Sequence, residues 1–356
     1  MKKKITVIFL IFMAIAAMTT IAVRGQATGS GLKRGDGPKD TLPKIAVAYV
    51  EDYRKGTPDP HMFTHLIYSF LRINDTFDGI VVRYPEKLQS LVDLKKENPE
   101  LKIMVSIGGD KAGGFSEMAA NKKKRKAFAN AVKHLVDSLG LDGVDLDWEF
   151  PTVSVGGTSA SPEDEKNYVL LAKDLRKALG KKAWLSYYSN HGGKWIDHKR
   201  MLPYVSYVHV SGYNLAIPKE GEQAYHQSPL YASSKTGGWC VKRSIERHIE
   251  LGVPKEKIMM GIPFFGRGKS PFPTYAESPR YDQYAKDCKV VWDKDSQAPY
   301  FADDEGNLVM GFDNEQSIKA KFDFIRANGL PGVFVWNYDA DYPDHRLGKT
   351  IERLRK

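Results

Sequence analysis

Acidic residues crowd one short stretch of the chain, residues 141–150. The acids are Asp142, Asp145, Asp147 and Glu149, and the apolar residues that alternate with the last three are Val144, Leu146, Trp148 and Phe150. Alternation with a period of two predicts a β-strand whose successive side chains point to opposite faces. We therefore expect Asp145, Asp147 and Glu149 on one face. Asp142 lies an odd number of residues away, so it should point elsewhere, near the start of the strand.

Carboxyl groups crowded on one face can divide acid and base roles between them. Neighbouring negative charges and loss of hydration raise the pKa of some of these groups above that of others. One carboxyl can then donate a proton while its neighbour acts as a base or stabilises positive charge. The spacing does not fit a calcium-binding loop, which needs a glycine at its sixth position and a distant glutamate. The stretch therefore favours acid–base chemistry over a cation site.

The rest of the chain alternates short apolar runs with amphipathic stretches. The predicted strands are Ile45–Val50, His65–Leu71, Lys102–Ile107, Gly143–Glu149, Ala183–Tyr188, Tyr207–Gly212, Lys257–Pro263 and Gly332–Trp336. The clearest predicted helices are Glu86–Lys96, Lys123–Leu139, Pro162–Leu179, Val241–Leu251 and Glu315–Asn328. About eight strands, each followed by a crossover, predict an α/β fold of the (β/α)₈ barrel type. A doubly wound open sheet is less favoured, because no Gly-x-Gly-x-x-Gly follows the first strand.

Polar and aromatic residues stand where several predicted strands end. They are Tyr49, Phe70, Ser106, Glu149, Tyr213, Arg267 and Trp336. The C-terminal strand ends of an α/β barrel form its active site, so we expect these side chains to gather there. Residues 264–331 are long for a connection between the seventh and eighth strands. They hold three strand-like runs, Val290–Trp292, Ala298–Phe301 and Leu308–Met310, which predict a small β insertion.

The N-terminus has the pattern of an export signal. Lys2, Lys3 and Lys4 precede an apolar run too short to span a bilayer comfortably, and cleavage after Gly25 is plausible. An uncleaved membrane anchor is the alternative. We expect a signal peptide at 1–25, a linker at 26–43 and one catalytic domain at 44–356. The signal pattern predicts that the mature protein works outside the cytoplasm, secreted or periplasmic, without a membrane span. No cysteine that could carry a lipid lies nearby, so a bacterial lipid anchor is not expected.

Charge and cysteine content constrain partners only weakly. The net charge is +10, and four of the positive charges lie in the predicted signal, so +6 would remain. The basic run 121–126 begins an apolar-periodic helix, which favours a solvated helix face over a nucleic-acid contact. Cys240 and Cys288 show no metal-ligand spacing, and their pairing is left open. We expect no metal and no cofactor, and a monomer as the simplest state.

Several motifs together resemble glycoside hydrolase family 18, the chitinases. The acid run resembles the family's catalytic Asp-x-x-Asp-x-Asp-x-Glu motif. The stretches 104–109 (Met-Val-Ser-Ile-Gly-Gly), 261–267 (Gly-Ile-Pro-Phe-Phe-Gly-Arg) and 332–336 (Gly-Val-Phe-Val-Trp) resemble flanking strands of the family, in the same order. Tyr49 and Phe70 match aromatic residues at the ends of its first two strands. The resemblance extends from about Lys44 to the C-terminus, and its four-acid motif is the most specific part.

The resemblance implies a role for each motif residue. Glu149 would protonate the glycosidic oxygen, and the substrate's own acetamido oxygen would act as the nucleophile, because this family is an exception to the two-carboxylate scheme. Asp147 would accept the acetamido N–H, Asp145 would lie deeper and share a proton with it, and Asp142 would support the motif. Tyr213 would bind the acetamido oxygen. The remaining expected substrate-binding residues are Trp336, Tyr49, Phe70, Asn214 and Arg267.

The sequence departs from the family pattern at two positions. Asn214 follows Tyr213 where the family usually has aspartate, and Phe265 stands where tyrosine is common. The resemblance implies a retaining hydrolase of β-1,4 bonds at N-acetylglucosamine, with chitin or chitooligosaccharides as the leading substrates. An endo-β-N-acetylglucosaminidase of N-glycan chitobiose cores is the runner-up, and peptidoglycan is a weaker option. A non-catalytic glycan-binding protein of an uptake system is the alternative of a different class.

Overall fold

A computed structural model describes residues 31–34, 43–219, 221–269, 273–277, 283, 286 and 288–356. The residues from Leu32 onward belong to one compact unit. The predicted signal and most of the predicted linker lie outside the described residues. Among helices of the described ranges, none combines the length and apolarity needed to cross a membrane.

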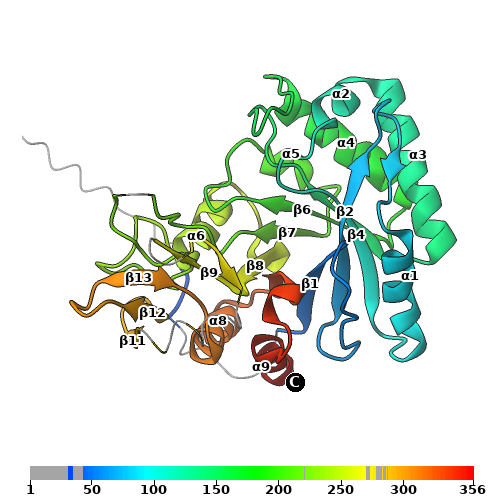
Figure 1. Ribbon diagram of the computed structural model, residues 1–356. Helices are drawn as coiled ribbons and strands as arrows, with labels where there is room; N and C mark the ends of the chain where they lie inside the picture. Colours follow the sequence, from blue (N-terminus) through cyan, green and yellow to red (C-terminus); the bar gives the residue numbers. More distant parts are fainter. Residues whose placement is uncertain are drawn as a thin grey trace, which may run out of the picture. The chain divides into compact units, whose positions relative to one another are not determined.

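The centre of this unit is a closed barrel of parallel strands (Figure 1). Its strands are β1 (Ile45–Glu51), β2 (His65–Ile73), β4 (Lys102–Gly108), β5 (Gly143–Asp147), β6 (Trp184–Ser189), β7 (Tyr207–Val210), β8 (Ile258–Pro263) and β14 (Gly332–Trp336). They follow one another around the barrel in chain order, and β1 closes it by pairing with both β14 and β2. The predicted (β/α)₈ barrel is therefore confirmed.

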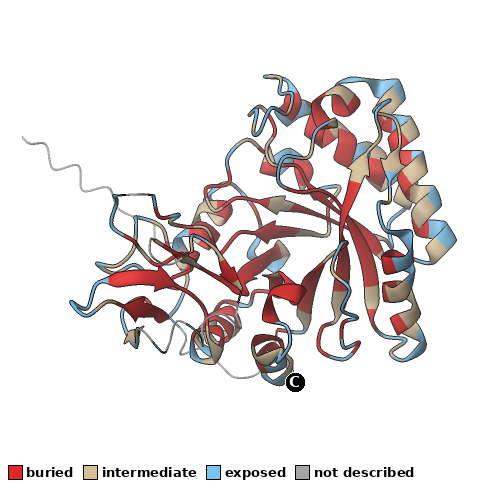
Figure 2. Ribbon diagram, viewed as in Figure 1, coloured by how far each residue is buried: buried red, intermediate tan, exposed pale blue. Residues whose placement is uncertain are grey.

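Helices cover the outer face of the barrel (Figures 1 and 2). The larger ones are α1 (Pro85–Asp93), α3 (Lys122–Leu139), α4 (Asp164–Leu179), α6 (Val241–Glu250), α8 (Glu315–Asn328) and α9 (Arg346–Arg355). In α3 the Asn121 side chain accepts hydrogen bonds from the Lys123 and Lys124 amides, and Gly140, with φ of 62°, ends the helix. Phe128 and Val132 are buried, while the basic first turn mostly faces solvent. This is the solvated helix face that the sequence favoured.

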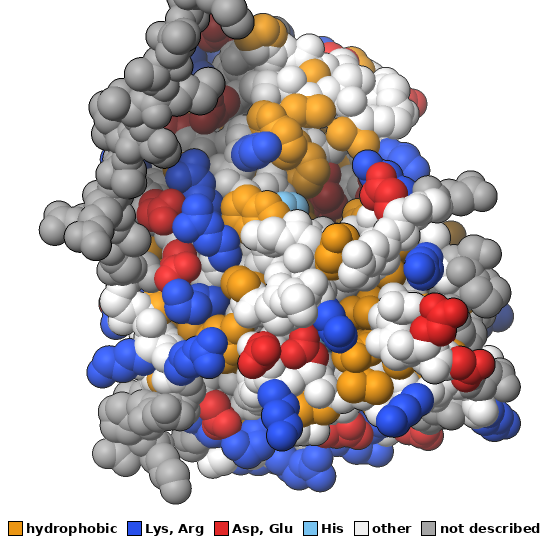
Figure 3. All heavy atoms as spheres, turned by 90° about the vertical axis from the view of Figure 1, so that its left-hand side faces the viewer, with side chains coloured by type: hydrophobic (Ala, Val, Ile, Leu, Met, Phe, Trp, Pro, Cys, Tyr) orange, Lys and Arg blue, Asp and Glu red, His pale blue; other side chains and the backbone are white. Residues whose placement is uncertain are grey.

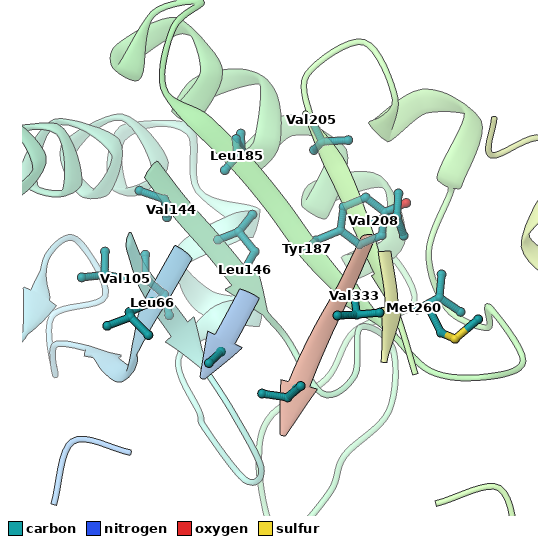
Figure 4. Close-up of a cluster of buried hydrophobic side chains, with 14 of the residues drawn as sticks. Leu66, Val105, Val144, Leu146, Leu185, Tyr187, Val205, Val208, Met260 and Val333 are labelled. Atoms are coloured by element: carbon teal, nitrogen blue, oxygen red, sulfur yellow. The ribbon is translucent and has the colours of Figure 1, made fainter. Parts of the chain in front are cut away.

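Two hydrophobic layers lie on either side of the barrel wall. Figure 4 shows the outer layer, where Val144 and Leu146 of β5 pack with residues from neighbouring strands such as Val105 and Leu185. The inner layer is formed by residues of the opposite parity and includes Val47, Ile67, Met104, Met259 and Phe334. Alternation along each strand therefore separates an apolar outer side from an inner side that carries the acids.

The predicted β insertion between the seventh and eighth barrel strands is present. Its strands are β9 (Phe265–Gly268), β10 (Ala276–Glu277), β11 (Lys289–Asp293), β12 (Ala298–Ala302) and β13 (Leu308–Gly311), and they form a second sheet in the order β10-β9-β13-β12-β11. Just after it, Lys321 of α8 forms a fully buried ion pair with Asp313 at 2.7 Å. Figure 3 shows Lys and Arg side chains intermixed with Asp and Glu side chains on this side of the molecule.

Some sequence-based boundaries were wrong. The acid strand ends at Asp147 rather than Glu149, and helix α4 begins at Asp164 rather than Pro162. The predicted helix 86–96 is α1 followed by a 3₁₀ turn, Leu94–Lys96. Elements that the sequence did not predict include β3 (Ile80–Val81), α2 (Phe115–Ala120), α5 (His198–Met201), β10 and α9. Most are short, with too few residues to show a period.

Two further sequence questions are answered by local contacts. Cys240 is a buried free thiol just before α6, so the disulfide with Cys288 that the sequence left open is not formed.

Lys33, within the predicted linker, donates its backbone N–H to the Asn328 side chain at the end of α8, and the side-chain amide of Asn328 donates to the Lys33 carbonyl. This part of the linker therefore contacts the barrel domain.

Candidate active site

The acid row stands at the C-terminal end of β5, facing into the barrel. Asp145 is fully buried and Asp147 is 5% exposed. Although β5 ends at Asp147, the alternation continues, because Trp148 turns outward and stacks on Phe115 with ring centroids 5.0 Å apart. Glu149 follows at the barrel mouth and is half-buried. The three acids therefore form a row from the barrel interior to its mouth, as the period-two pattern predicted.

Asp145, at the inner end of the row, is held by hydroxyl groups from three other strands. Tyr49 donates to its Oδ2 at 2.8 Å, Ser106 donates to the same oxygen at 2.8 Å, and Ser186 donates to Oδ1 at 2.6 Å. The Tyr49 hydroxyl also contacts Nδ1 of His209 at 2.8 Å. Both carboxylate oxygens are thus satisfied in a region without solvent, which suits a supporting role.

Asp147, in the middle of the row, has fewer hydrogen-bond donors around it than Asp145. Its Oδ1 atom is buried and has no hydrogen-bond partner among the described residues. Burial, followed by the charges of Glu149 and Asp145, raises the pKa of Asp147 well above its ordinary value. A buried carboxyl with an unused oxygen is ready to bind a donor from a ligand, such as an amide N–H.

Two glycines make room beside Asp147. Gly108 has φ of 122°, and a Cβ on it would lie 2.1 Å from the Asp147 carbonyl oxygen. The Gly109 amide donates to that same carbonyl at 2.9 Å. A Cβ on Gly109 would also come within 2.7 Å of the Phe70 ring. The Ser-x-Gly-Gly stretch at the end of β4 is therefore explained by the close approach of backbone and ring at this point.

Glu149 has the properties of a proton donor near neutral pH. Burial raises its pKa to about 7, and the charge of Asp110 contributes a smaller increase in the same direction. A carboxyl whose pKa lies near the working pH can both give up and take back a proton, which is the requirement for general acid–base catalysis.

A cavity of about 450 Å³ opens above this row. Its lining includes Asp147, Glu149, Tyr188, Tyr213, Asn214, Phe70, Trp336, Phe265, Arg267 and Tyr275. Trp336 stacks on Phe70 with centroids 5.6 Å apart and planes at 22°. A stacked aromatic pair beside acidic groups can bind the flat, apolar face of a sugar ring while polar groups bind its hydroxyls.

Tyrosines on the neighbouring strands face the same cavity. Tyr213 packs edge-on against Phe265 and Phe334, and burial raises the pKa of its phenol well above 10, so the hydroxyl stays protonated and can donate. Tyr188, at the end of β6, also lines the cavity, and burial raises its pKa in the same way. Sequence reasoning missed Tyr188, although its position two residues after Ser186 gives it the same inward parity.

Asn214 and Arg267 contact each other at one side of the cavity. The Arg267 Nε donates to Asn214 Oδ1 at 2.8 Å, and its Nη1 donates to the Thr274 carbonyl at 3.2 Å. The guanidinium also lies over the rings of Phe265 and Tyr275, at 5.2 and 5.3 Å. Both residues therefore belong to the cavity wall, where the sequence expected substrate-binding groups.

Two predicted residues lie away from the cavity. Tyr49 is 2% exposed and bonds Asp145 beneath the site, so its contact is with the acid row, whereas the sequence expected it to bind substrate. Asp142 bonds the Ile103 amide at 2.9 Å and pairs with Lys95 at 2.8 Å on the outside of the barrel. Its odd spacing had placed it off the reactive face. Within the described ranges, no cluster of three or more His, Cys, Asp or Glu could hold a metal ion.

The closed barrel, the acid row and the aromatic-lined cavity define an acid–base enzyme of the glycoside hydrolase class. The chain belongs to glycosyl hydrolases family 18, because the model of that family matches residues 45–341. The family resemblance found in the sequence is therefore confirmed.

The proteins that this chain is similar to include chitinases and a family 18 N-acetylglucosaminidase. Probable chitinase 2 of Drosophila melanogaster is 27% identical over 84% of this chain and 72% of its own length. The chitinase ChiW of Paenibacillus sp. FPU-7 has a TM-score of 0.79 and 26% identity, covering 87% of this chain but only 42% of that one. A family 18 N-acetylglucosaminidase from Paenibacillus barengoltzii has a TM-score of 0.76 and 28% identity, covering 87% of this chain and 99% of that one.

Proposed function

We propose that this protein hydrolyses β-1,4 bonds at N-acetylglucosamine with retention of configuration, using the substrate's acetamido oxygen as the nucleophile. The observation that carries this proposal is the pairing of a proton-donating Glu149 with Asp147, whose buried Oδ1 has no partner among the described residues. An acetamido N–H is a donor of the kind that this oxygen lacks. Chitin and chitooligosaccharides are the leading substrates, in line with the chitinases among the relatives.

Two of the other carboxylates that line the cavity, those of Glu51 and Asp52, are engaged by donors of the protein, which argues against either of them as the nucleophile. Glu51 accepts from Arg54 at 3.2 Å and from the Tyr53 hydroxyl at 2.6 Å. Asp52 is held by two hydrogen bonds from Arg83, at 2.9 and 2.8 Å. A carboxylate held by a guanidinium in two hydrogen bonds is a weak nucleophile, because its charge is already stabilised.

The reaction would proceed in two displacements. Glu149 donates its proton to the glycosidic oxygen while the acetamido oxygen attacks the anomeric carbon and the glycosidic bond breaks. Asp147 accepts the acetamido N–H and stabilises the positive ring that forms, and the Tyr213 hydroxyl donates to the acetamido oxygen. Ionised Glu149 then removes a proton from a water molecule, which attacks the same carbon and reopens the ring. Two inversions give retention, and intramolecular attack can reach effective molarities of about 10⁵–10⁸ M.

We further propose that the mature protein works outside the cytoplasm, secreted or periplasmic, on the strength of the signal-like residues 1–25. We propose a monomer acting alone on its glycan. A long polymer such as chitin cannot enter a cell intact, so an exported hydrolase is the arrangement that gives this activity access to its substrate.

Product analysis tests the substrate. The protein would be incubated separately with chitohexaose and with a high-mannose glycoprotein, and the products would be weighed by mass spectrometry. We expect short chitooligosaccharides from the first and no change in the second. A clipped glycan that leaves one sugar on asparagine would instead identify an endo-β-N-acetylglucosaminidase. Binding of chitohexaose without any product would identify a non-catalytic glycan-binding protein.

A further inference from the structure

The cavity contains arginines, but an uncharged chitin chain offers them no counter-charge. Arg72, Arg83 and Arg267 all line it. Burying part of a guanidinium costs free energy unless an anion or several hydrogen bonds compensate for the lost hydration. The partners of each arginine therefore indicate which of them has capacity left for a ligand.

Two of these three arginines, Arg83 and Arg72, lie near carboxylates of the protein. Arg83 forms its double hydrogen bond with Asp52. Arg72 has a buried Nη1 without a hydrogen-bond partner in the described residues, but it lies within electrostatic range of Asp52, Asp147 and Asp110. Its positive charge lowers the pKa of Asp147 slightly against the larger raising effects. Arg72 therefore already has an electrostatic role within the acid row.

Arg267 differs from both. Its two hydrogen bonds go to neutral oxygens, those of the Asn214 side chain and the Thr274 backbone. No carboxylate of the described residues lies within ion-pair distance of it. The nearby acids Glu51 and Glu277 are both bonded to Arg54. Burial lowers the pKa of Arg267, and Tyr275 opposes this shift. Among the described residues, Arg267 is thus a half-buried cation that faces the cavity without a counter-charge.

From this arrangement we propose that the cavity accepts a glycan in which a carboxylate-bearing sugar neighbours N-acetylglucosamine, and that Arg267 binds the carboxylate. The inference rests on the proposed function and narrows its substrate class. A guanidinium matches a carboxylate in shape and charge, and its fork of N–H groups leaves donors free after the bonds to Asn214 and Thr274. Asn214 holds the guanidinium in place without neutralising its charge, whereas an aspartate at this position would neutralise it.

Paired substrates that differ only in charge test the proposal. Peptide-free strands of alternating N-acetylglucosamine and N-acetylmuramic acid, and hyaluronan oligosaccharides, would each be compared with their methyl esters, with chitohexaose as a neutral reference. For at least one pair we expect kcat/KM on the acid to exceed that on the ester by about 10- to 100-fold, the size of one charge-assisted hydrogen bond. The pair that shows the preference identifies a lactyl ether or a uronic acid as the source of the carboxylate.

Three variants test whether the preference for the acid over its ester depends on Arg267. In Arg267→Gln and in Asn214→Asp the ratio of acid to ester should fall to about one, mainly through KM, because the first removes the cation and the second neutralises it. Arg243→Gln removes an exposed arginine of α6 and should keep the wild-type ratio. Dissociation constants measured with the inactive Glu149→Gln protein should show the same preference without any turnover.

The outcomes separate this inference from the proposed function. Cleavage of chitohexaose together with an acid-to-ester ratio near one for both pairs would overturn the carboxylate site and leave the hydrolase intact. A preference that survives unchanged in both Arg267→Gln and Asn214→Asp would also overturn it. If the folded protein cleaved none of these glycans, the proposed activity and the inference would both be wrong.

Discussion

The two ends of the acid row on β5 are built differently, although the same strand carries them on the same face. At the inner end, Asp145 accepts hydrogen bonds from Tyr49, Ser106 and Ser186 and is fully buried. Toward the mouth, the pKa values of Asp147 and Glu149 are both raised by burial. Hydrogen-bond donors compensate for burial at the inner end, and the described protein supplies fewer of them toward the mouth.

This difference shows how one strand can combine support and chemistry. A buried carboxylate whose oxygens are all bonded adds rigidity, and removing it leaves several donors without an acceptor. A buried carboxyl with few donors instead holds a proton at a higher pH and can transfer it. We therefore expect substitutions at the inner end to affect mainly stability and substitutions at the outer end to affect mainly turnover.

The largest expected effect comes from Glu149→Gln. The amide keeps the size and polarity of the side chain but cannot donate a proton to the glycosidic oxygen. Turnover of chitohexaose should fall by about 10²–10⁴-fold, the usual contribution of general acid catalysis, while binding is kept. Initial rates and calorimetric binding of the same substrate would measure both.

The matched control is Glu250→Gln on the exposed surface of α6, which should leave turnover at the wild-type level. If Glu149→Gln hydrolysed chitohexaose as fast as the wild type, Glu149 would not be the proton donor. If it lost binding as well, its role would be in holding the sugar.

The next largest effect should appear at the inner end, in stability. Asp145→Ala would leave the hydroxyls of Ser106 and Ser186 without their acceptor inside the barrel, while the Tyr49 hydroxyl would keep its contact with His209. The free energy of unfolding should fall by at least about 2 kcal/mol, because each buried donor left unsatisfied costs about 1–3 kcal/mol. Urea unfolding with an unchanged m-value would measure the loss. Glu149→Gln should change the same quantity by less than about 1 kcal/mol, and equal losses in the two variants would refute the comparison.

The contrast between the two ends also marks what the sequence could predict. The period-two pattern placed Asp145, Asp147 and Glu149 on one face and Asp142 off it, and the structure agrees even where the strand ends early. Local alternation was sufficient, because the direction of a side chain along a strand depends only on backbone geometry. The same local reasoning identified the barrel strands and the insertion.

The partners of each acid could not be predicted in this way. Ser186 of β6 donates to Asp145, and Nδ1 of His209 in β7 lies 3.6 Å from Asp145 Oδ1. Both contacts depend on the register between strands far apart in sequence. Tyr49 was expected at the cavity and lies below it, because its strand places it one layer deeper than Phe70. The hydrogen bonds of Arg267 to the neutral oxygens of Asn214 and Thr274 likewise become visible only in the folded chain. The residue types can be read from the sequence, whereas tertiary packing decides which of their polar atoms have hydrogen-bond partners.

The pH dependence of activity tests the raised pKa of Glu149 at the outer end of the acid row. Glu149 must be protonated to act as the acid, and its pKa is raised to about 7. Activity should therefore be present below that pH and fall as pH rises through about 7. A profile of kcat/KM against pH with chitohexaose would report this value for the free enzyme. An alkaline limb near pH 4.5, the ordinary value for glutamate, would mean that burial does not control this group.

The smallest expected effect tests which influence dominates at Glu149. Burial is the main cause of its raised pKa, and the charge of Asp110 is the secondary one. The Asp110 side chain is 72% exposed, so water and salt screen its charge. Asp110→Asn should therefore move the alkaline limb to lower pH by only a fraction of a unit at low salt, and hardly at all at 1 M salt. Asp304→Asn, an exposed change in the insertion, should not move it. A large shift in Asp110→Asn that persisted in high salt would show that a specific charge pair, rather than burial, sets the proton affinity of the outer end.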